Sequence, residues 1–209
     1  DLTDVDYAAV NTQGTANVLA LAEAGGAGLL QVSTAYVCGK RDGEIREDDP
    51  LPTAGFANGY EKSKAAAERL VRAADVEWAI ARPAITLGES ATGRIRQFDA
   101  IYLAFKLIAE GRIRLVPAGR NATLNFVSVD HVAGGIVALV ANWEKAKGGT
   151  YHLVSSEPLP MVDFAKIIRQ RRLPGVLDPN SIHVVNLTTG KVVYHARSED
   201  FAYGDKGRI

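Results

Sequence analysis

Tyr60 and Lys64 are the two side chains whose types and spacing could most directly do chemistry. They stand four residues apart at the start of an alanine-rich run that continues to Ala74 without Pro or Gly, which predicts a helix. Residues four apart share one face of a helix, so a phenol would lie beside an ammonium group. The positive charge would lower the pKa of Tyr60 from about 10 toward neutrality, where a tyrosine can transfer a proton.

The Tyr-x-x-x-Lys spacing alone is weak evidence, because two further pairs show it. Tyr36 and Lys40 match, but a glycine lies between them in a predicted loop. Tyr102 and Lys106 match inside a predicted helix with no reactive neighbour in the sequence. The choice among the three pairs therefore depends on the flanking segments.

Two apolar segments enclose the predicted helix that carries the first pair. Residues 28–32 read as a buried strand that runs into the hydroxyl residues Ser33 and Thr34, and residues 76–82 read as a second strand halted by Pro83. Strand, helix and strand in this order predict a parallel βαβ unit with a right-handed crossover. Ligands gather at the carboxyl ends of parallel strands. The hydroxyl pair, the start of the helix and the segment after Pro83 should therefore meet at one edge.

Six short motifs follow one another in a fixed order between about residues 4 and 168. They are residues 10–15, 32–37, 59–70, 81–83, 88–93 and 126–133. With these motifs the chain resembles the extended short-chain dehydrogenases/reductases. It is most similar to their thioester-reductase and fatty-acyl-reductase branch, which has the male sterility type of NAD-binding domain.

The resemblance implies an α/β fold, a Rossmann-like doubly wound parallel sheet that lacks its N-terminal strands, with a small C-terminal α+β substrate lobe. Residues 1–90 would form the C-terminal half of the NAD(P)-binding domain, residues 91–175 the substrate-lobe helices with strands returning to the sheet, and residues 176–209 a hairpin and tail.

A Gly-rich turn after a first strand, which would seat a dinucleotide pyrophosphate, is not found in the sequence. The glycines of residues 25–28 precede a strand, and Gly88 and Gly93 lack the close spacing. We expect the chain to begin beyond that turn and the first strands. The predicted strand at residues 29–32 would then have an unpaired edge, where a second copy or another partner could bind.

The resemblance also implies roles for individual residues. Tyr60 would be the general acid, and Lys64 would lower its pKa and hold the nicotinamide ribose. Thr34 would hydrogen-bond the substrate carbonyl, and Asn11 would support a water that links Lys64 to solvent. The implied cofactor contacts are Ser33, Tyr60, Lys64, Pro83, Ala84 and Ile85, and the implied substrate contacts are Thr34, Thr92 and Gly93.

The implied reaction is an NAD(P)H-dependent hydride transfer to an acyl-thioester or aldehyde carbonyl, with NADP as the cofactor and NAD as the alternative. Two other readings stay open. One is a non-catalytic or split-assembly fragment that needs a partner for its missing strands. The other is a sugar-nucleotide epimerase or dehydratase that uses the same Tyr60 and Lys64. The apolar predicted helix at residues 98–110 fits either core packing or an acyl pocket.

Composition excludes several other classes. The 209 residues carry a formal net charge of zero, so no nucleic-acid or anionic-membrane surface is predicted. The single cysteine, Cys38, excludes an internal disulfide and suits a reducing compartment, and we expect a cytoplasmic protein. No apolar run is long enough to span a bilayer. The acidic loop at residues 40–58 has no histidine, and no metal site is predicted.

The remaining elements are predicted from periodicity and breakers. They are a helix at residues 7–24 ended by Gly25 and Gly26, a strand at 125–130, a helix at 131–141 capped by Asp130, a strand at 150–154, a helix at 161–172, and a hairpin of residues 181–187 and 192–195.

Overall fold

The computed structural model describes residues 3–95, 107–108, 112, 122–170, 181–185 and 192–197. The chain divides into two compact units. The first comprises Asp1–Thr86 with His131–Ser156, and the second comprises Leu87–Asp130 with Glu157–Ile209. The residues predicted to be catalytic all belong to the first unit.

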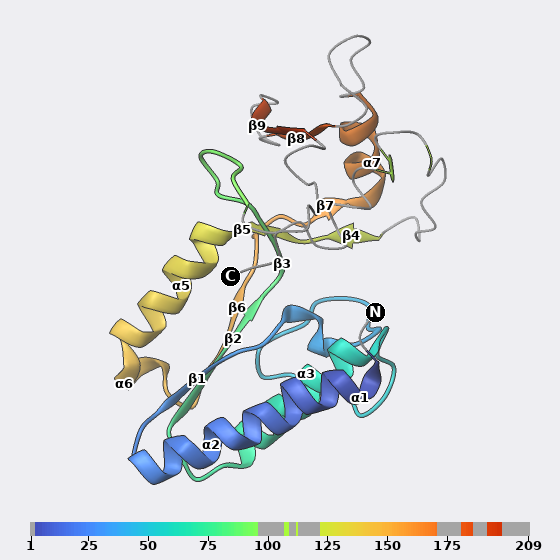
Figure 1. The fold of residues 1–209 in the computed structure, drawn as a ribbon. Helices are drawn as coiled ribbons and strands as arrows, with labels where there is room; N and C mark the ends of the chain where they lie inside the picture. Colours follow the sequence, from blue (N-terminus) through green and yellow to red (C-terminus); the bar gives the residue numbers. More distant parts are fainter. Residues whose placement is uncertain are drawn as a thin grey trace, which may run out of the picture. The chain divides into compact units, whose positions relative to one another are not determined.

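A parallel sheet forms the centre of the first unit (Figure 1). Its strands are β1 (Leu29–Val32), β2 (Trp78–Pro83) and β6 (Thr150–Leu153), in the order β1-β2-β6. Both pairings are parallel, with Leu29 opposite Trp78 and Ile80 opposite Thr150. The predicted parallel βαβ unit is therefore confirmed. Among the described residues β1 pairs on one side only, and the predicted partner at its edge stays a prediction.

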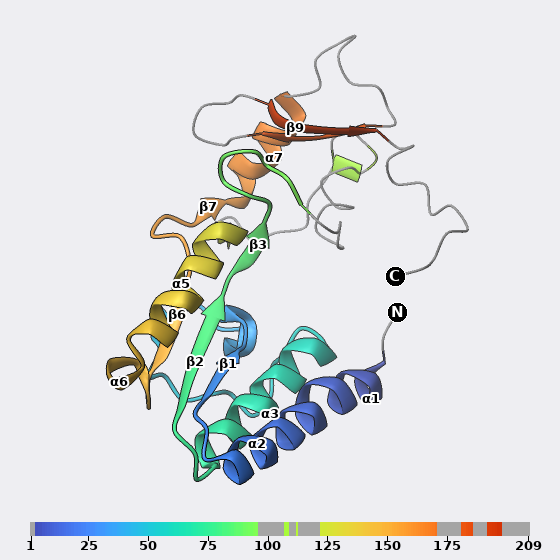
Figure 2. The ribbon, with the colours of Figure 1, turned by 60° about the vertical axis from the view of Figure 1, so that its left-hand side comes forward.

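The helix that connects β1 to β2 is α3 (Gly59–Ala73), which begins at its cap Asn58 because the side chain of Asn58 accepts a hydrogen bond from the Glu61 amide. It lies beside α2 (Gly14–Gly25) on one face of the sheet (Figure 2). Leu19 of α2, Val71 of α3 and Ile80 of β2 form one buried cluster. This cluster fixes α3, which carries the predicted catalytic residues Tyr60 and Lys64, against the sheet.

The N-terminal helical segment differs from the single helix predicted for residues 7–24. The structure has α1 (Asp4–Tyr7), then a π-helical stretch over Ala8–Gln13, then α2. A π-helix makes i→i+5 bonds and is wider than an α-helix, and apolar periodicity does not reveal it. The predicted stop is confirmed, because Gly26 caps α2 with a φ of 60°.

The opposite face of the sheet carries α5 (Val129–Ala141), followed by the short α6 (Trp143–Ala146) (Figure 1). A Cβ on Gly135 of α5 would come within 2.7 Å of the Leu153 side chain, so the glycine permits close contact with β6. Helices on both faces of a parallel sheet make the unit Rossmann-like and doubly wound, as predicted.

In the second unit, β4 (Thr123–Leu124) pairs antiparallel with β7 (Leu159–Pro160), and α7 (Met161–Gln170) follows directly. The predicted strand at 125–130 is β5 (Phe126–Ser128). The short β3 (Ile85–Leu87) follows β2 along the chain. The predicted hairpin is confirmed as β8 (Ser181–Val185) and β9 (Val192–Arg197). The predicted helix at residues 98–110 lies outside the described residues, apart from 107 and 108, which are helical.

Asp130 is not the helix cap that the sequence predicted. It lies in the first turn of α5, and its carboxylate accepts hydrogen bonds from the Ser90 amide and hydroxyl, both at 2.7 Å. These bonds hold the pKa of Asp130 below its ordinary value, and the bond from the Ser90 hydroxyl has the larger effect. The partner lies 40 residues away in the sequence, so helix-start preferences could not reveal it.

Candidate active site

Lys64 reaches from α3 to the end of the neighbouring strand. Its ammonium group donates a hydrogen bond to the carbonyl of Val32, the last residue of β1, at 2.7 Å. Ser33 and Thr34 follow Val32 directly, and Tyr60 stands one helical turn before Lys64. The structure therefore brings Thr34, Tyr60 and Lys64 together at the carboxyl end of β1.

Tyr60 lies between Thr34 and Tyr7, with its side chain partly in solvent. The residue is 37% exposed, and the ring of Tyr7 stands edge-on with its centroid 6.0 Å away. Burial raises the pKa of Tyr60, the hydrogen bond with the Thr34 side chain lowers it, and the net pKa lies above the ordinary value of 10.0. The predicted lowering by Lys64 is wrong here, because burial outweighs every other influence and Lys64 is not among the groups that shift this pKa.

Lys64 responds to burial in the opposite direction. Desolvation lowers the pKa of its ammonium group below the ordinary 10.5, and the carboxylate of Glu68, one turn further along α3, partly offsets this. The Lys64 ammonium group is thus a hydrogen-bond donor at the end of β1 that is partly shielded from water.

The two hydroxyl residues after β1 differ in what they bind. The Thr34 side chain accepts a hydrogen bond from the Tyr36 amide at 3.4 Å and so caps a 3-10 helix over Ala35–Cys38. The Ser33 hydroxyl is buried and has no hydrogen-bond partner, which is true of no other buried side-chain oxygen or nitrogen in the described part of the chain. A buried hydroxyl without a partner calls for an explanation, and a bound ligand is one.

The segment after β2 lies where the apolar side of the site was predicted. Pro83 pairs with Leu153 at the end of the sheet, and the Ala84 amide donates to the Leu153 carbonyl at 3.2 Å. Ala84 is buried and Ile85 is half-buried. Because β1 and β2 are parallel neighbours, Pro83–Ile85 and Ser33–Thr34 lie at the same edge, as predicted.

Asn11 lies in the π-helical stretch and faces the start of α3. Its side-chain amide donates to the Ser63 hydroxyl at 3.0 Å. The predicted role of Asn11 in supporting a water beside Lys64 stays a prediction. Ser63 was not predicted as a site residue, although its place directly before Lys64 could have suggested one.

Thr92 and Gly93 belong to the second unit, where they form a turn. The Thr92 hydroxyl donates to the Glu89 carboxylate at 2.6 Å, and Gly93 has a φ of 70°. Their assignment to the substrate stays a prediction.

A buried ion pair that was not predicted holds α3 to β2. Glu68 of α3 and Arg82 of β2 form two hydrogen bonds, of 3.0 and 2.8 Å, and are 0% and 3% exposed. Arg82 also lies 3.5 Å from Nε2 of His152 on β6. The pair ties the helix that carries Tyr60 and Lys64 to the strand that ends at Pro83.

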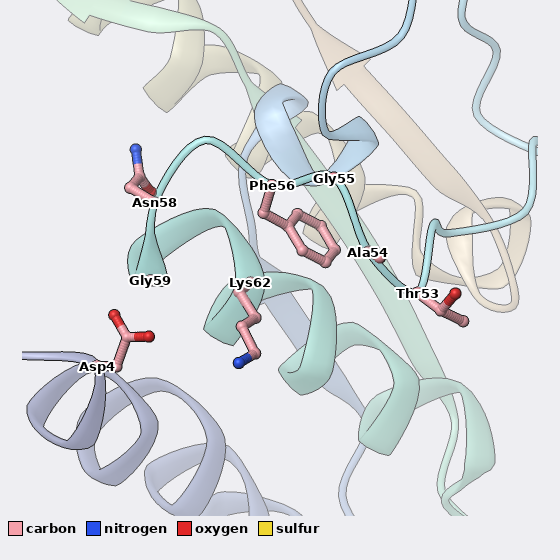
Figure 3. A pocket seen from close by; sticks show the side chains of 8 residues that line it. All are labelled: Asp4, Thr53, Ala54, Gly55, Phe56, Asn58, Gly59 and Lys62. Carbon is pink, nitrogen blue, oxygen red and sulfur yellow. The ribbon is translucent and has the colours of Figure 1, made fainter.

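A pocket of about 450 Å³ opens at the start of α3 (Figure 3). Figure 3 shows the Asp4 carboxylate facing Gly59, with the Lys62 side chain on the same side of α3 as α1. Its lining is Asp4, Thr53, Ala54, Gly55, Phe56, Asn58, Gly59 and Lys62. Gly59, which lines the pocket, directly precedes Tyr60, but none of the predicted site residues lines it.

In the described part of the chain no helix is both long and apolar enough to cross a membrane. The same residues contain no cluster of three or more His, Cys, Asp or Glu side chains that could hold a metal ion.

A doubly wound parallel sheet with Thr34, Tyr60 and Lys64 at the end of β1 defines an NAD(P)-binding domain of the extended short-chain dehydrogenase/reductase type. The model of the male sterility protein family matches residues 4–136. The chain belongs to this family.

Two sequence relatives share the matched region. Aldehyde reductase lnaA of Aspergillus flavus is 31% identical over 159 residues, which cover 69% of this chain and 15% of that protein. The uncharacterized protein y4nL of Sinorhizobium fredii is 28% identical over 169 residues, which cover 78% of this chain and 45% of that protein. The chain thus spans less than half the length of either relative.

Solved structures give the same fold. The terminal R domain of the myxalamid PKS-NRPS biosynthetic pathway superposes with a TM-score of 0.66 at 32% identity, over 77% of this chain and 42% of that domain. A UDP-glucuronic acid 4-epimerase of Bacillus cereus in complex with NAD superposes with a TM-score of 0.60 at 19% identity, over 75% of this chain and 50% of the epimerase. The latter similarity establishes the fold alone.

The family implies a nicotinamide dinucleotide, and the residues present fit its nicotinamide end. The buried Ser33 hydroxyl lacks a partner, the Lys64 ammonium donates to the carbonyl of the preceding residue, Val32, and the buried Ala84 is apolar and lies at the same edge. A hydroxyl, a cation and an apolar surface are the groups that a ribose and an uncharged amide-bearing ring would contact.

Proposed function

We propose that this chain is the catalytic part of an NAD(P)H-dependent reductase that acts on an acyl-thioester or aldehyde carbonyl. The main support is the hydrogen bond between the Tyr60 and Thr34 side chains at the carboxyl end of β1. There a phenol and a hydroxyl can both bind one carbonyl oxygen. The similarity to a terminal R domain at 32% identity and to an aldehyde reductase at 31% identity supports this substrate class over others.

The residues would divide the work as follows. The Thr34 hydroxyl donates a hydrogen bond to the substrate carbonyl and orients it, and the Tyr60 phenol gives its proton to the same oxygen as negative charge develops there. The bound nicotinamide supplies the hydride. Lys64 holds the ribose, Ser33 accepts or donates at the buried edge, and Pro83–Ile85 exclude water from the reacting face.

The direction of the Tyr60 pKa shift suits carbonyl reduction. A phenol whose pKa lies above 10.0 is protonated throughout the neutral range, so it can act as a proton donor without first taking up a proton. In the free chain the hydrogen bond with the Thr34 side chain lowers the pKa of Tyr60 and so works against the burial that resists ionisation. When substrate is bound, the single Thr34 proton is directed at the carbonyl oxygen.

Binding of the cofactor can be tested before any substrate is known. We would titrate the chain calorimetrically with NADPH and with NADH, and compare the wild type with Lys64→Ala and Tyr60→Phe. We expect a Kd on the order of micromolar for at least one cofactor, weakened about tenfold or more by Lys64→Ala and weakened less by Tyr60→Phe. Lys62→Ala is the matched control, since it removes a cation from the same turn of α3.

Turnover then separates the substrate classes. NAD(P)H oxidation would be followed with an acyl-thioester, a long-chain aldehyde and a UDP-sugar, each with wild type, Tyr60→Phe and the control Tyr36→Phe, which shares the Tyr-x-x-x-Lys spacing. We expect turnover of the first or second substrate that Tyr60→Phe abolishes and Tyr36→Phe preserves. Conversion of the UDP-sugar alone would replace the proposal with the epimerase reading. Absence of cofactor binding up to millimolar concentration would refute the proposal for this chain.

A further inference from the structure

The Ser63 hydroxyl links Tyr60 to the π-helical stretch over Ala8–Gln13, which lies far away in the sequence. The residue is 5% exposed and stands in the first turns of α3, directly before Lys64. Its hydroxyl donates to the Tyr60 carbonyl at 2.8 Å and accepts from the side-chain amide of Asn11 at 3.0 Å. Asn11 is 52 positions away in the sequence, so the second bond is a tertiary one.

The proton inventory fixes the direction of these bonds. A serine hydroxyl has one proton to donate, whereas the NH₂ group of an asparagine only donates. Because Asn11 fills the acceptor side of the Ser63 oxygen, the Ser63 proton remains directed at Tyr60. A serine that bonds back to an earlier carbonyl in its own helix is common, and the bond from Asn11 is what makes this one an anchor.

The π-helical stretch presents Asn11 and its neighbour Thr12 to the same residue. The Thr12 hydroxyl donates to the Ser63 carbonyl at 3.4 Å. The Asn11 carbonyl in turn accepts from the Thr15 hydroxyl at 2.6 Å, which fixes the backbone of Asn11. Two consecutive side chains thus reach one residue of α3, and the wider π-helical turn allows it.

Tyr60 needs such an anchor because of its place in the helix. It is the second residue of α3, and the first turn of a helix frays most readily because its amides lack partners within the helix. A shift of the order of 1 Å at a reacting group can cost about a hundredfold in rate. Holding the Tyr60 carbonyl in place holds the phenol against Thr34.

We propose that Ser63 and Asn11 form a hydrogen-bond relay that positions Tyr60. Both are positioning residues, since neither touches the reacting atoms. The effect on turnover rests on the proposed reductase function, but the effect on the phenol itself does not.

The first test follows the ionisation of Tyr60 by NMR of ¹³Cζ-labelled tyrosine, assigned with Tyr60→Phe, between about pH 8 and 12. We expect the raised Tyr60 pKa to fall by at least about half a unit toward 10 in Ser63→Ala, because a loosened first turn admits water to the phenol. Asn11→Ala should produce the same shift, because it removes the donor that keeps the Ser63 hydroxyl directed at Tyr60 and adds no charge. Thr12→Val removes the weaker bond to the same residue, keeps its shape, and should leave the pKa unchanged.

The second test uses turnover of the cofactor-loaded chain. Ser63→Ala and Asn11→Ala should each lower kcat about tenfold or more and leave KM and the cofactor Kd within about twofold, while Ser63→Thr, which keeps the hydroxyl, should recover most of kcat. The double variant Ser63→Ala with Asn11→Ala should be no worse than Ser63→Ala alone, because both changes break one chain of bonds.

The outcomes distinguish the relay from the reductase proposal. A Tyr60 pKa that is the same in wild type, Ser63→Ala and Asn11→Ala would overturn the relay, as would an equal shift in Thr12→Val. If no cofactor binds, the reductase proposal fails, and the NMR titration still decides the relay. If turnover occurs and Ser63→Ala leaves kcat unchanged, the relay fails and the reductase proposal stands.

Discussion

Replacing Glu68 by Gln should lower the free energy of unfolding by about 3–5 kcal/mol, the cost of leaving a buried charge without its partner. The size follows from the burial of the pair, since Glu68 is 0% and Arg82 is 3% exposed and two hydrogen bonds of 3.0 and 2.8 Å join them. The glutamine side chain would keep the shape and one acceptor oxygen, so the loss measures mainly the missing charge. Because a domain of this size is stable by about 5–15 kcal/mol, the variant should be close to unfolding.

The opposite replacement, Arg82→Met, should cost less, about 1–3 kcal/mol. A guanidinium cannot lose its proton, so Arg82 stays charged when Glu68 is changed, and its other neighbour is an imidazole nitrogen 3.5 Å away. When Arg82 is changed, Glu68 keeps a second partner. It can pair with Arg72 on the next turn of α3, whose guanidinium lies 3.7 Å away.

Urea unfolding at pH 7, followed by far-UV circular dichroism, would measure both single variants and the double variant Glu68→Gln with Arg82→Met. We expect the double variant to be more stable than Glu68→Gln alone, which gives a coupling energy of about 2 kcal/mol or more. Glu44→Gln is the control, because its ion pair with Arg46 is largely exposed and should contribute nothing measurable. A loss for Glu68→Gln below about 1 kcal/mol, or additive losses in the double variant, would refute this reasoning.

Two further predictions concern packing and pH. Gly28→Ala should lower the free energy of unfolding by about 1–3 kcal/mol, because its Cβ would lie 2.8 Å from Cε2 of the Trp143 indole. Gly25→Ala meets open space and should change the free energy of unfolding by less than about 1 kcal/mol. Thermal unfolding would compare the two variants, and equal melting temperatures would contradict the packing argument. Burial holds the pKa of His152 below its ordinary 6.5 despite the nearby Glu47 carboxylate, so this residue contributes stability above pH 6.5 that is lost as the pH falls through the folded-state pKa. Between about pH 7.5 and 5 the free energy of unfolding should fall less steeply in His152→Gln than in the wild type, and parallel slopes would show that His152 is not responsible.

Local sequence predicted the elements that carry the site. The predicted strand at residues 29–32 is β1, the alanine-rich run is α3, and the second apolar strand ends at Pro83. These elements obey local rules, because the run is rich in helix-forming residues and lacks interior Gly or Pro, and proline interrupts a strand. Once the strands were expected to be parallel, the meeting of Thr34 with the start of the helix followed from the topology.

The features that the sequence did not reveal depend on partners far along the chain. The bond between Asn11 and Ser63 spans 52 positions, and the π-helical turn that supports it has no apolar period of its own. Glu68 and Arg82 were ordinary charged residues in the sequence, since burial of a charge depends on a partner that only tertiary structure supplies. The wrong assignment of Asp130 has the same cause. In the sequence an aspartate beside a helix start is expected to cap it, and the actual partner, Ser90, lies 40 positions away.

The pKa values of Tyr60 and Lys64 show how the site can favour one direction of reaction. The sequence suggested that Lys64 would pull the phenol toward ionisation, but the ammonium group donates to Val32 and burial raises the pKa of Tyr60 instead. A phenol that stays protonated is a ready donor and a poor acceptor, so carbonyl reduction needs no prior ionisation, whereas alcohol oxidation does. A donor with a raised pKa also gives up its proton reluctantly, and the hydrogen bond with Thr34 is the described interaction that reduces this cost. The balance between burial and that one bond depends on where the phenol stands, which is why a relay that holds the Tyr60 backbone has consequences for its chemistry.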